Sequence, residues 1–186
     1  MQNGIEAILS KHQLVPVVTI NSMNEIDSIA KKLSDQGIFC IEITLRTAVA
    51  WEAIKVFKER YGSSFDVGVG TIISKNNVEQ AVEIGVDFMV SPGCTETLAE
   101  AMDRSGVAFL PGVSTPSEII KAKENGWNYF KFFPANLFGG LKALKTYGAL
   151  FPDSFFCPTG GISRENYSSY LELDNVVCVG GSWLTK

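Results

Sequence analysis

The sequence predicts an α/β protein with a (β/α)8 TIM barrel, in which the last outer helix is missing or incomplete. Three observations lead to this fold class: eight short apolar runs recur along the chain, amphipathic helical patterns lie between them, and glycines separate the two. Strands that alternate with helices form parallel sheets. An open doubly wound sheet of eight strands is the alternative, but a chain of 186 residues leaves about 23 for each unit, which favours the compact barrel.

The expected strands are nearly continuous in valine, isoleucine, phenylalanine and cysteine. Strands of a parallel sheet have this composition when both of their faces are buried. In chain order they are 14–20, 39–45, 66–72, 87–93, 107–113, 128–134, 154–160 and 176–182. We therefore expect residues 1–186 to form a single barrel domain.

Helical patterns fill the intervals between the expected strands. Apolar residues at helical spacing mark helices around 26–33 and 51–57. The stretch TPSE at 115–118 is a capping box, with Pro116 at the first helical position. Glycines follow these patterns and are expected to supply the left-handed turn that ends a helix: Gly37, Gly62, Gly85, Gly106 and Gly126.

Composition restricts the class of protein. Hydrophobic residues make up 46% and charged residues 19% of the chain, as in a globular protein with a large core. The net charge of −4 and the lack of a basic block argue against nucleic-acid binding. No apolar run reaches the roughly 18 residues of a membrane span, and the N-terminus does not resemble a signal peptide. We expect a cytoplasmic protein without nucleic-acid or membrane partners.

The cysteines and the histidine predict neither disulfides nor a metal site. Cys40, Cys94, Cys157 and Cys178 lie far apart, and three of them fall in apolar runs. Reduced core thiols of a cytosolic protein are therefore expected. His12 is the only histidine, which excludes a zinc site with several histidine ligands.

Polar and turn residues lie where the expected strands end, which is the catalytic face of a (β/α)8 barrel. Lys131 lies in the aromatic stretch YFKFFP and Glu42 lies in the second strand. Because successive strand residues point to opposite faces, both point into the barrel when their apolar neighbours point out. The other candidates at strand ends are Arg46, Thr71, Pro92, Thr159, Gly160, Gly161, Gly180, Gly181 and Ser182.

This set of residues predicts Schiff-base chemistry on a carboxylated keto compound. An apolar pocket disfavours the charged form of a lysine, so the free amine of Lys131 can attack a ketone. Glu42 is the candidate acid/base for the proton transfers. Arg46, helped by Thr71, would hold a substrate carboxylate. The two glycine pairs with Ser182 would form an anion cradle, which suits a phosphorylated substrate.

The same residues could instead have purely structural roles. Lys131 and Glu42 could form a buried ion pair that only supports the fold, although such pairs stabilise weakly. Glu42 and Arg46 could be surface groups at a helix start, and the glycine pairs could be simple turns. A phosphosugar epimerase and a barrel that only binds a ligand are the alternative functions. The epimerase would not need Lys131, so Lys131→Ala would leave it largely active but should abolish a Schiff-base enzyme. Binding of pyruvate without imine formation would favour the ligand-binding barrel.

Several short stretches resemble the bacterial 2-keto-3-deoxy-6-phosphogluconate (KDPG) and 4-hydroxy-2-oxoglutarate (KHG) aldolases. In chain order they are EITLRT (42–47), VGVGTI (67–72), SPG (91–93), LPGVSTPSE (110–118), KFFPA (131–135), PTGGI (158–162) and GGSWL (180–184). The resemblance runs in order from residue 14 to the end of the chain. The combination of KFFPA, PTGGI and GGSWL is highly specific.

The resemblance implies a class I aldolase with the (β/α)8 fold, usually a homotrimer, without metal or organic cofactor. The implied substrates are KDPG, cleaved to pyruvate and glyceraldehyde 3-phosphate, and KHG, cleaved to pyruvate and glyoxylate. Lys131 would be the Schiff-base lysine and Glu42 the general acid/base. Arg46 and Thr71 would bind the carboxylate, and Pro92 would line the pyruvate end. Around the distal hydroxyls and phosphate the resemblance places Thr159, Gly160, Gly161 and Ser182.

The chain departs from the family pattern near the substrate tail and at its end. Asn136 follows KFFPA where many members carry glutamate, and Thr19 and Asn21 lie where some relatives have arginine. The preferred substrate is therefore open among KDPG, its galactonate analogue and KHG. The closing helical segment of the family is absent after GGSWL, so we expect a truncated or partly ordered form of a longer protein. If the short form is real, a weaker phosphate site and an exposed apolar patch are expected.

Overall fold

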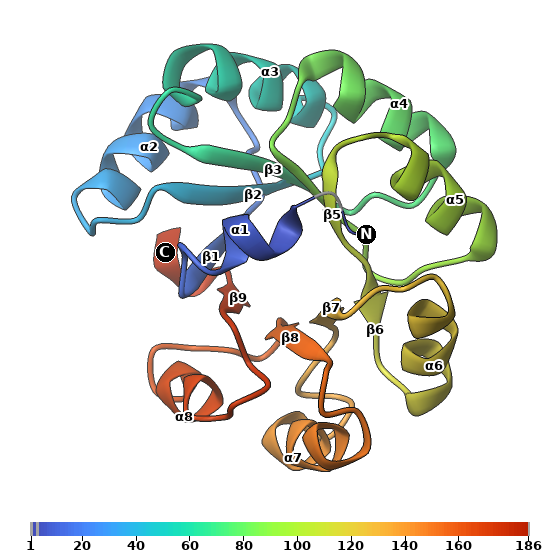
Figure 1. The fold of residues 1–186 in the computed structure, drawn as a ribbon. Coiled ribbons are helices and arrows are strands. Elements are labelled where there is room, and N and C mark those ends of the chain that lie inside the picture. Colours follow the sequence, from blue (N-terminus) through green and yellow to red (C-terminus); the bar gives the residue numbers. More distant parts are fainter. Residues whose placement is uncertain (1, 3, 186) are drawn as a thin grey trace.

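The computed structural model describes residue 2 and residues 4–185, with parallel strands in the middle and helices around them (Figure 1). The larger sheet contains β1 (Leu14–Val18), β2 (Cys40–Thr44), β3 (Asp66–Gly70), β4 (Phe88–Val90), β5 (Ala108–Leu110) and β9 (Val179–Gly181). Its strand order is β5-β4-β3-β2-β1-β9. The smaller sheet, in the order β6-β7-β8, contains β6 (Gly112–Val113), β7 (Tyr129–Phe132) and β8 (Phe155–Pro158). Every strand lies within a run predicted from the sequence.

The prediction of a closed (β/α)8 barrel is wrong. The run 107–113 splits at Pro111 into β5, which pairs with β4, and β6, which pairs with β7. Proline has no amide hydrogen, so it cannot donate to a ladder at this position. On the other side, only the isolated bridges Phe156↔Val176 and Thr159↔Gly180 connect the smaller sheet with the segment leading into β9. The strands therefore form a curled half-barrel of six and a separate sheet of three.

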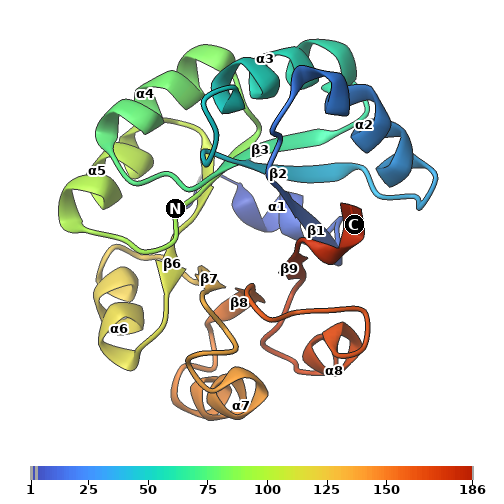
Figure 2. The ribbon, with the colours of Figure 1, turned by 180° about the vertical axis from the view of Figure 1, so that it is seen from behind.

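The helices lie outside the strands, except for α1 (Figures 1 and 2). They are α1 (Ile5–Leu9), α2 (Ile26–Ser34), α3 (Ala50–Tyr61), α4 (Lys75–Ile84), α5 (Glu96–Arg104), α6 (Pro116–Glu124), α7 (Gly140–Leu150) and α8 (Tyr167–Leu171). Two 3-10 helices, η1 (Met23–Glu25) and η2 (Trp183–Thr185), precede α2 and follow β9. Among the described residues, no helix combines the length and apolar composition needed to cross a membrane.

The predicted helix ends are confirmed in most cases. The capping box at α6 is present, because Glu118 N–H donates to Thr115 Oγ1 at 3.4 Å and Thr115 N–H donates to Glu118 Oε2 at 2.8 Å. Four of the five expected glycine turns have a positive φ, at 37, 85, 106 and 126. The fifth expectation is wrong, because Gly62 has a φ of −63° and lies in ordinary helical backbone.

Two apolar clusters lie on the two sides of the strands. The larger cluster, between strands and outer helices, contains Ile41, Ile43, Phe130 and Phe132. The smaller cluster lies inside the curve of the strands, where α1 packs. Its buried members are Ile5, Leu9, Val15, Cys40, Phe88, Val90, Ala108, Leu110, Cys157 and Cys178. The polar side chains of the site pack against this interior apolar cluster.

The N-terminal segment is fastened to the amino ends of several strands. Gln2 Oε1 accepts hydrogen bonds from the backbone amides of Asn128 and Tyr129 at 3.0 and 2.8 Å, at the start of β7. His12 Nε2 lies 2.7 Å from Asp66 Oδ2, at the start of β3. These contacts hold α1 at the amino ends of the strands, which leaves the carboxyl ends for the polar residues predicted there.

Candidate active site

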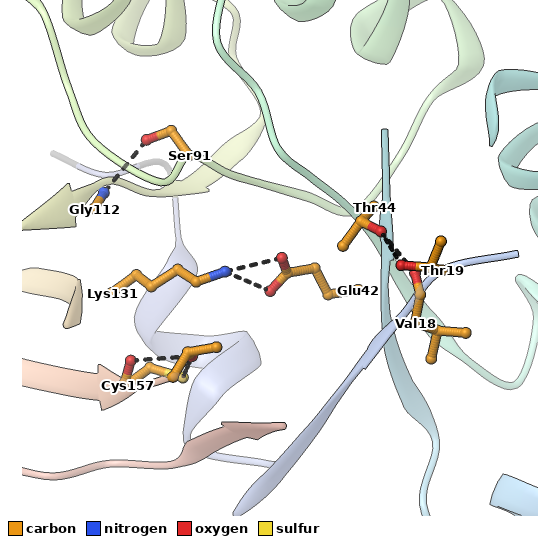
Figure 3. A network of polar contacts seen from close by, with 9 residues as sticks. Val18, Thr19, Glu42, Thr44, Ser91, Gly112, Lys131 and Cys157 are labelled. Atoms are coloured by element: carbon orange, nitrogen blue, oxygen red, sulfur yellow. Dashed lines mark hydrogen bonds and ion pairs between the residues drawn. The ribbon is translucent and has the colours of Figure 1, made fainter. Parts of the chain in front are cut away.

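A buried ion pair between Lys131 and Glu42 lies at the centre of the site (Figure 3). Lys131 Nζ donates to Glu42 Oε1 at 3.0 Å and to Oε2 at 3.2 Å. The two side chains are only 6% and 4% exposed. They extend toward each other from β7 and β2, strands of different sheets (Figure 3). The structure therefore brings together the two residues that strand alternation predicted to point inward.

The apolar neighbours of the pair point the other way, into the outer core. Phe130 and Phe132 are fully buried there, and the Phe132 ring lies 5.9 Å from that of Tyr147 on α7. Ile41 and Ile43 flank Glu42 in the same manner. The aromatic stretch around Lys131 is thus the outer face of β7, and the lysine belongs to its inner face.

Glycines of β3 make room for buried side chains of the neighbouring strands, Glu42 among them. Gly70 pairs with Thr44 in the neighbouring strand, and a Cβ atom at Gly70 would overlap Glu42 Oε1. A Cβ atom at Gly68 would overlap the ring of Phe88. Sequence analysis did not select these glycines as site residues. Their signal was the alternation VGVG in a buried strand, since glycine in a strand interior often marks a close approach.

The surroundings of Lys131 are apolar and aromatic. The ring centroid of Phe133 lies 5.3 Å from Nζ, within the range of a cation–π contact. Beneath the pair, burial raises the pKa of the Cys40 thiol, and a hydrogen bond with Cys157 together with burial raises the pKa of Cys178. All four cysteines are free. The prediction of core positions is confirmed for Cys40, Cys157 and Cys178, which are buried, whereas Cys94 is half-buried. The raised pKa values keep the thiols of Cys40 and Cys178 neutral near pH 7.

Threonine hydroxyls join the carboxyl ends of β1 and β2. Thr19 Oγ1 lies 2.9 Å from Thr44 Oγ1, which in turn donates to the carbonyl of Val18 at 3.1 Å (Figure 3). Thr47 Oγ1 donates to the carbonyl of Ile20 at 2.7 Å. These bonds fix the loop after β2, which carries Arg46, beside the end of β1.

A cavity of about 610 Å³ opens beside this loop, at the carboxyl ends of β1, β8 and β9. Its lining includes six of the predicted residues: Arg46, Thr159, Gly160, Gly161, Gly181 and Ser182. The remaining lining residues are Val17, Val18, Thr19, Glu25, Ser28, Ile29, Ile162 and Thr185. Of these, sequence analysis had noted only Thr19. Glu25 and Ser28 carried no signal, because neither lies in a motif or at the end of a predicted strand.

Close backbone packing shapes the glycine-rich wall of the cavity. Gly160 and Gly161 have φ values of 96° and 73°, a region that other residues adopt at a cost. A Cβ atom at Gly180 would overlap Thr159 Oγ1. At Gly161 it would overlap Asn136, the residue that departs from the family pattern. At these positions a larger residue would overlap a neighbouring side chain or adopt an unfavourable backbone conformation. The structure therefore requires glycine here, and the glycine pairs are more than simple turns.

Two predicted residues lie away from this cavity, next to the ends of β3 and β4. Thr71 is half-buried and has a φ of 68°, the only positive φ of a non-glycine residue in the described chain. A Cβ atom at Gly112 would overlap the carbonyl of Pro92, and Gly112 N–H donates to Ser91 Oγ at 3.3 Å (Figure 3). The lining of the cavity also lacks the buried Lys131–Glu42 pair and Gly180. The predicted site thus divides into a buried reactive centre and an adjoining open cavity.

Within the part of the chain that the structure describes, no group of three or more His, Cys, Asp or Glu side chains is placed to hold a metal ion. The chemistry that this arrangement offers is that of an amine and a carboxylate in contact, beside a guanidinium group and several hydroxyls.

Comparisons with known proteins agree on one family. The family model described as "KDPG and KHG aldolase" matches residues 5–186. A 2-dehydro-3-deoxy-phosphogluconate aldolase of Pseudoalteromonas atlantica is 41% identical over 95% of this chain and 82% of its own length. The KHG/KDPG aldolase of Escherichia coli is 40% identical over 98% of this chain and 85% of its own length.

Solved structures give the same result. The KDPG aldolase of Legionella pneumophila, solved with pyruvate captured as a covalent carbinolamine intermediate, superimposes with a TM-score of 0.93. It is 39% identical, with coverage of 98% of this chain and 87% of that one. The KDPG aldolase of Zymomonas mobilis, solved with 3-phosphoglycerate, gives the same TM-score, identity and coverage.

Proposed function

This chain belongs to the family of the KDPG and KHG aldolases, and from that premise we propose how its residues carry out the reaction. The reaction is a class I, Schiff-base cleavage of KDPG to pyruvate and glyceraldehyde 3-phosphate, of KHG to pyruvate and glyoxylate, or of both. The enzyme is therefore a carbon–carbon lyase. The observation that carries the residue assignment is the 3.0 Å contact between Lys131 Nζ and Glu42 Oε1.

Lys131 is the nucleophile and Glu42 is its proton acceptor. The carboxylate takes a proton from the ammonium group, and the free amine attacks the keto carbon of the substrate to give a carbinolamine. Glu42 returns the proton to the hydroxyl group, which leaves as water, and an iminium ion remains. The short contact supports this assignment, because a general base must lie within hydrogen-bond reach of the proton that it takes.

Cleavage then follows from the iminium ion. Glu42 accepts the proton of the substrate hydroxyl, the adjacent carbon–carbon bond breaks, and its electron pair moves toward the iminium nitrogen to form an enamine. The aldehyde half is released. Protonation of the enamine carbon by Glu42 and hydrolysis of the imine release pyruvate and restore the amine of Lys131. One carboxylate held beside the nitrogen serves every step, which is consistent with its burial.

Arg46 and Thr71 hold the carboxylate of the pyruvate half, and Pro92 lines that end. The guanidinium of Arg46 lines the cavity and has no ion-pair partner among the described residues, so its charge is free for a substrate. Thr71 supports the same role through its backbone. A β-branched residue in the left-handed region costs about 1–3 kcal/mol, and such strain is concentrated at functional sites.

The glycine-rich wall receives the aldehyde half. Thr159, Ser182 and the glycine pairs at 160–161 and 180–181 surround its hydroxyl and phosphate groups. Support comes from the shape of the cavity, which these residues line except for Gly180, and from the left-handed backbone of the first pair. Backbone amides exposed by such glycines can donate to an anion.

The assignment of Lys131 is tested by comparing Lys131→Ala with Lys142→Ala in a coupled assay for pyruvate release. Lys142 is exposed on α7 and is not among the residues that line the cavity. We expect Lys131→Ala to abolish the cleavage of KDPG and KHG, while Lys142→Ala retains it. Substantial activity of a folded Lys131→Ala variant would remove the Schiff-base mechanism.

We further propose that residues 1–186 form one domain and that the enzyme acts in the cytoplasm as a homotrimer, without metal or organic cofactor. The family resemblance supports these statements. Light scattering at several protein concentrations tests the trimer, and undiminished activity after dialysis against EDTA tests the absence of a metal requirement.

A further inference from the structure

The boundary between the two sheets runs through Pro111, and Ser91 bridges it. β5 ends at Leu110 in the larger sheet, and β6 begins at Gly112 in the smaller one. Ser91 follows β4 directly and is fully buried. Its N–H donates to the carbonyl of Leu110 at 3.2 Å, and its Oγ accepts from the N–H of Gly112 at 3.3 Å. One serine therefore holds both sides of the proline at the point where the sheets divide.

The register of β4 and β5 explains why a side chain is needed here. Val90 pairs with Leu110, and continuing that register would direct the N–H of Gly112 to the backbone carbonyl of Ser91. In the structure this N–H donates to the hydroxyl oxygen instead. A buried amide left without an acceptor is costly. The hydroxyl of Ser91 thus supplies the acceptor that the bend at the proline takes away from the ladder.

The peptide group between Pro111 and Gly112 connects this hydroxyl with the reactive lysine. Its carbonyl accepts from the N–H of Lys131 at 2.9 Å, and its N–H is the one that donates to Ser91. Gly112 is also the register partner of Lys131. Hydrogen bonds in such a series polarise and strengthen one another. The series starts in the larger sheet, which carries Glu42, and ends in the smaller sheet at Lys131 (Figure 3).

We propose that Ser91 is a positioning residue for the Schiff-base lysine. Its hydroxyl fixes the peptide group that holds the backbone of Lys131, and thereby the contact between Lys131 Nζ and Glu42. This inference rests on the proposed function of the pair. Proton transfer between the two side chains requires hydrogen-bond reach, and they come from different sheets, so a shift of β6 and β7 lengthens the contact. Arg46 follows β2 in the larger sheet, so carboxylate binding does not depend on Ser91.

The test uses three variants. Ser91→Ala removes the acceptor, and Ser91→Cys fills the site with a weaker acceptor. Ser154→Ala is the matched control, because Ser154 is also fully buried but its hydroxyl has no hydrogen-bond partner among the described residues. Each variant whose circular dichroism spectrum is that of the unaltered enzyme is mixed with pyruvate, and the rate of formation of the borohydride-trapped adduct at Lys131 is measured. Competitive inhibition by lactate, which has a carboxylate but no ketone, measures carboxylate binding separately.

We expect Ser91→Ala to slow adduct formation by about tenfold to 100-fold, because small misplacements of reacting groups have effects of this size. Ser91→Cys should be slowed by a smaller factor, about threefold or more. The inhibition constant of lactate should stay within about twofold of that of the unaltered enzyme in both. Ser154→Ala should change neither quantity. Adduct formation at the unaltered rate in Ser91→Ala, or in Ser91→Cys where Ser91→Ala does not fold, overturns the proposal. Equal slowing in Ser154→Ala, or an equal weakening of lactate inhibition, overturns it as well.

Failure of this inference is distinguishable from failure of the proposed function. An adduct at Lys131 that forms equally fast in the unaltered enzyme and in Ser91→Ala refutes the role of Ser91 alone. The lack of any adduct in the unaltered enzyme refutes the Schiff-base mechanism on which the inference rests.

Discussion

Replacing Glu42 with glutamine removes the counter-charge of a buried lysine while leaving the shape of the side chain. At the separation of 3.0 Å, Coulomb attraction amounts to about 5.5 kcal/mol with an effective dielectric constant of about 20, before desolvation is subtracted. Breaking a buried pair by removal of one partner costs about 3–5 kcal/mol. Because glutamine still offers an oxygen to Nζ, we expect the lower end, about 3 kcal/mol. For a chain of this size that lowers Tm by about 6–12 °C.

Urea-induced unfolding, monitored by tryptophan fluorescence, measures this loss. Glu52→Gln on α3 is the matched control and should change the unfolding free energy by less than about 0.5 kcal/mol. The double variant Glu42→Gln/Lys131→Met removes both charges and should recover most of the loss, because a buried pair replaced by neutral groups is often tolerated. A Glu42→Gln variant as stable as the control, or a double variant no more stable than the single one, would refute the reasoning.

Further predictions concern the backbone of the site and the N-terminal segment. Gly70→Ala should lower the unfolding free energy by about 1–3 kcal/mol and reduce aldol cleavage, because the added Cβ overlaps Glu42 Oε1. Gly93→Ala is the control, because a Cβ at this position meets no atom within 4 Å, and it should change neither the unfolding free energy nor the rate of cleavage. Thr71→Gly should keep the unfolding free energy or raise it by up to about 1 kcal/mol, because glycine adopts the positive φ without strain. The KM for substrate should rise because the hydroxyl is lost. A clear loss of stability would contradict the expected relief of strain. Burial and a hydrogen bond with Glu6 raise the pKa of Tyr129 to about 12, above its usual value of about 10. The folded state therefore holds the proton more tightly, so Tyr129 makes the unfolding free energy fall as pH rises from about 10 to about 12. Other groups with raised pKa values contribute to the same fall, so urea unfolding of Tyr129→Phe should show a smaller fall than the unaltered enzyme.

The positions of the strands could be predicted because strands that are buried on both faces consist almost entirely of apolar residues. Each observed strand lies within one of the predicted apolar runs. The closure of the barrel could not be predicted from those runs. It depends on hydrogen bonds around Pro111 and between the segments of β8 and β9, and an apolar run does not specify its ladder partners.

The reactive centre could be predicted from strand alternation, whereas the cavity beside it could be predicted only in part. Lys131 and Glu42 lie inside apolar runs, where a charged residue stands out and its direction follows from its neighbours. Gly70 could have been found from the VGVG alternation. Glu25 lies in a short 3-10 helix on a polar stretch, and only the path of the chain brings it to the cavity. No local pattern identifies such a residue.

The most direct test of the account is borohydride reduction in the presence of pyruvate, followed by mass mapping of the modified peptide. We predict a single pyruvyl adduct on Lys131, no adduct in Lys131→Ala, and an unaffected yield in Lys142→Ala. An adduct on another lysine, or no adduct although pyruvate is shown to bind, would contradict the assignment of Lys131 as the Schiff-base residue.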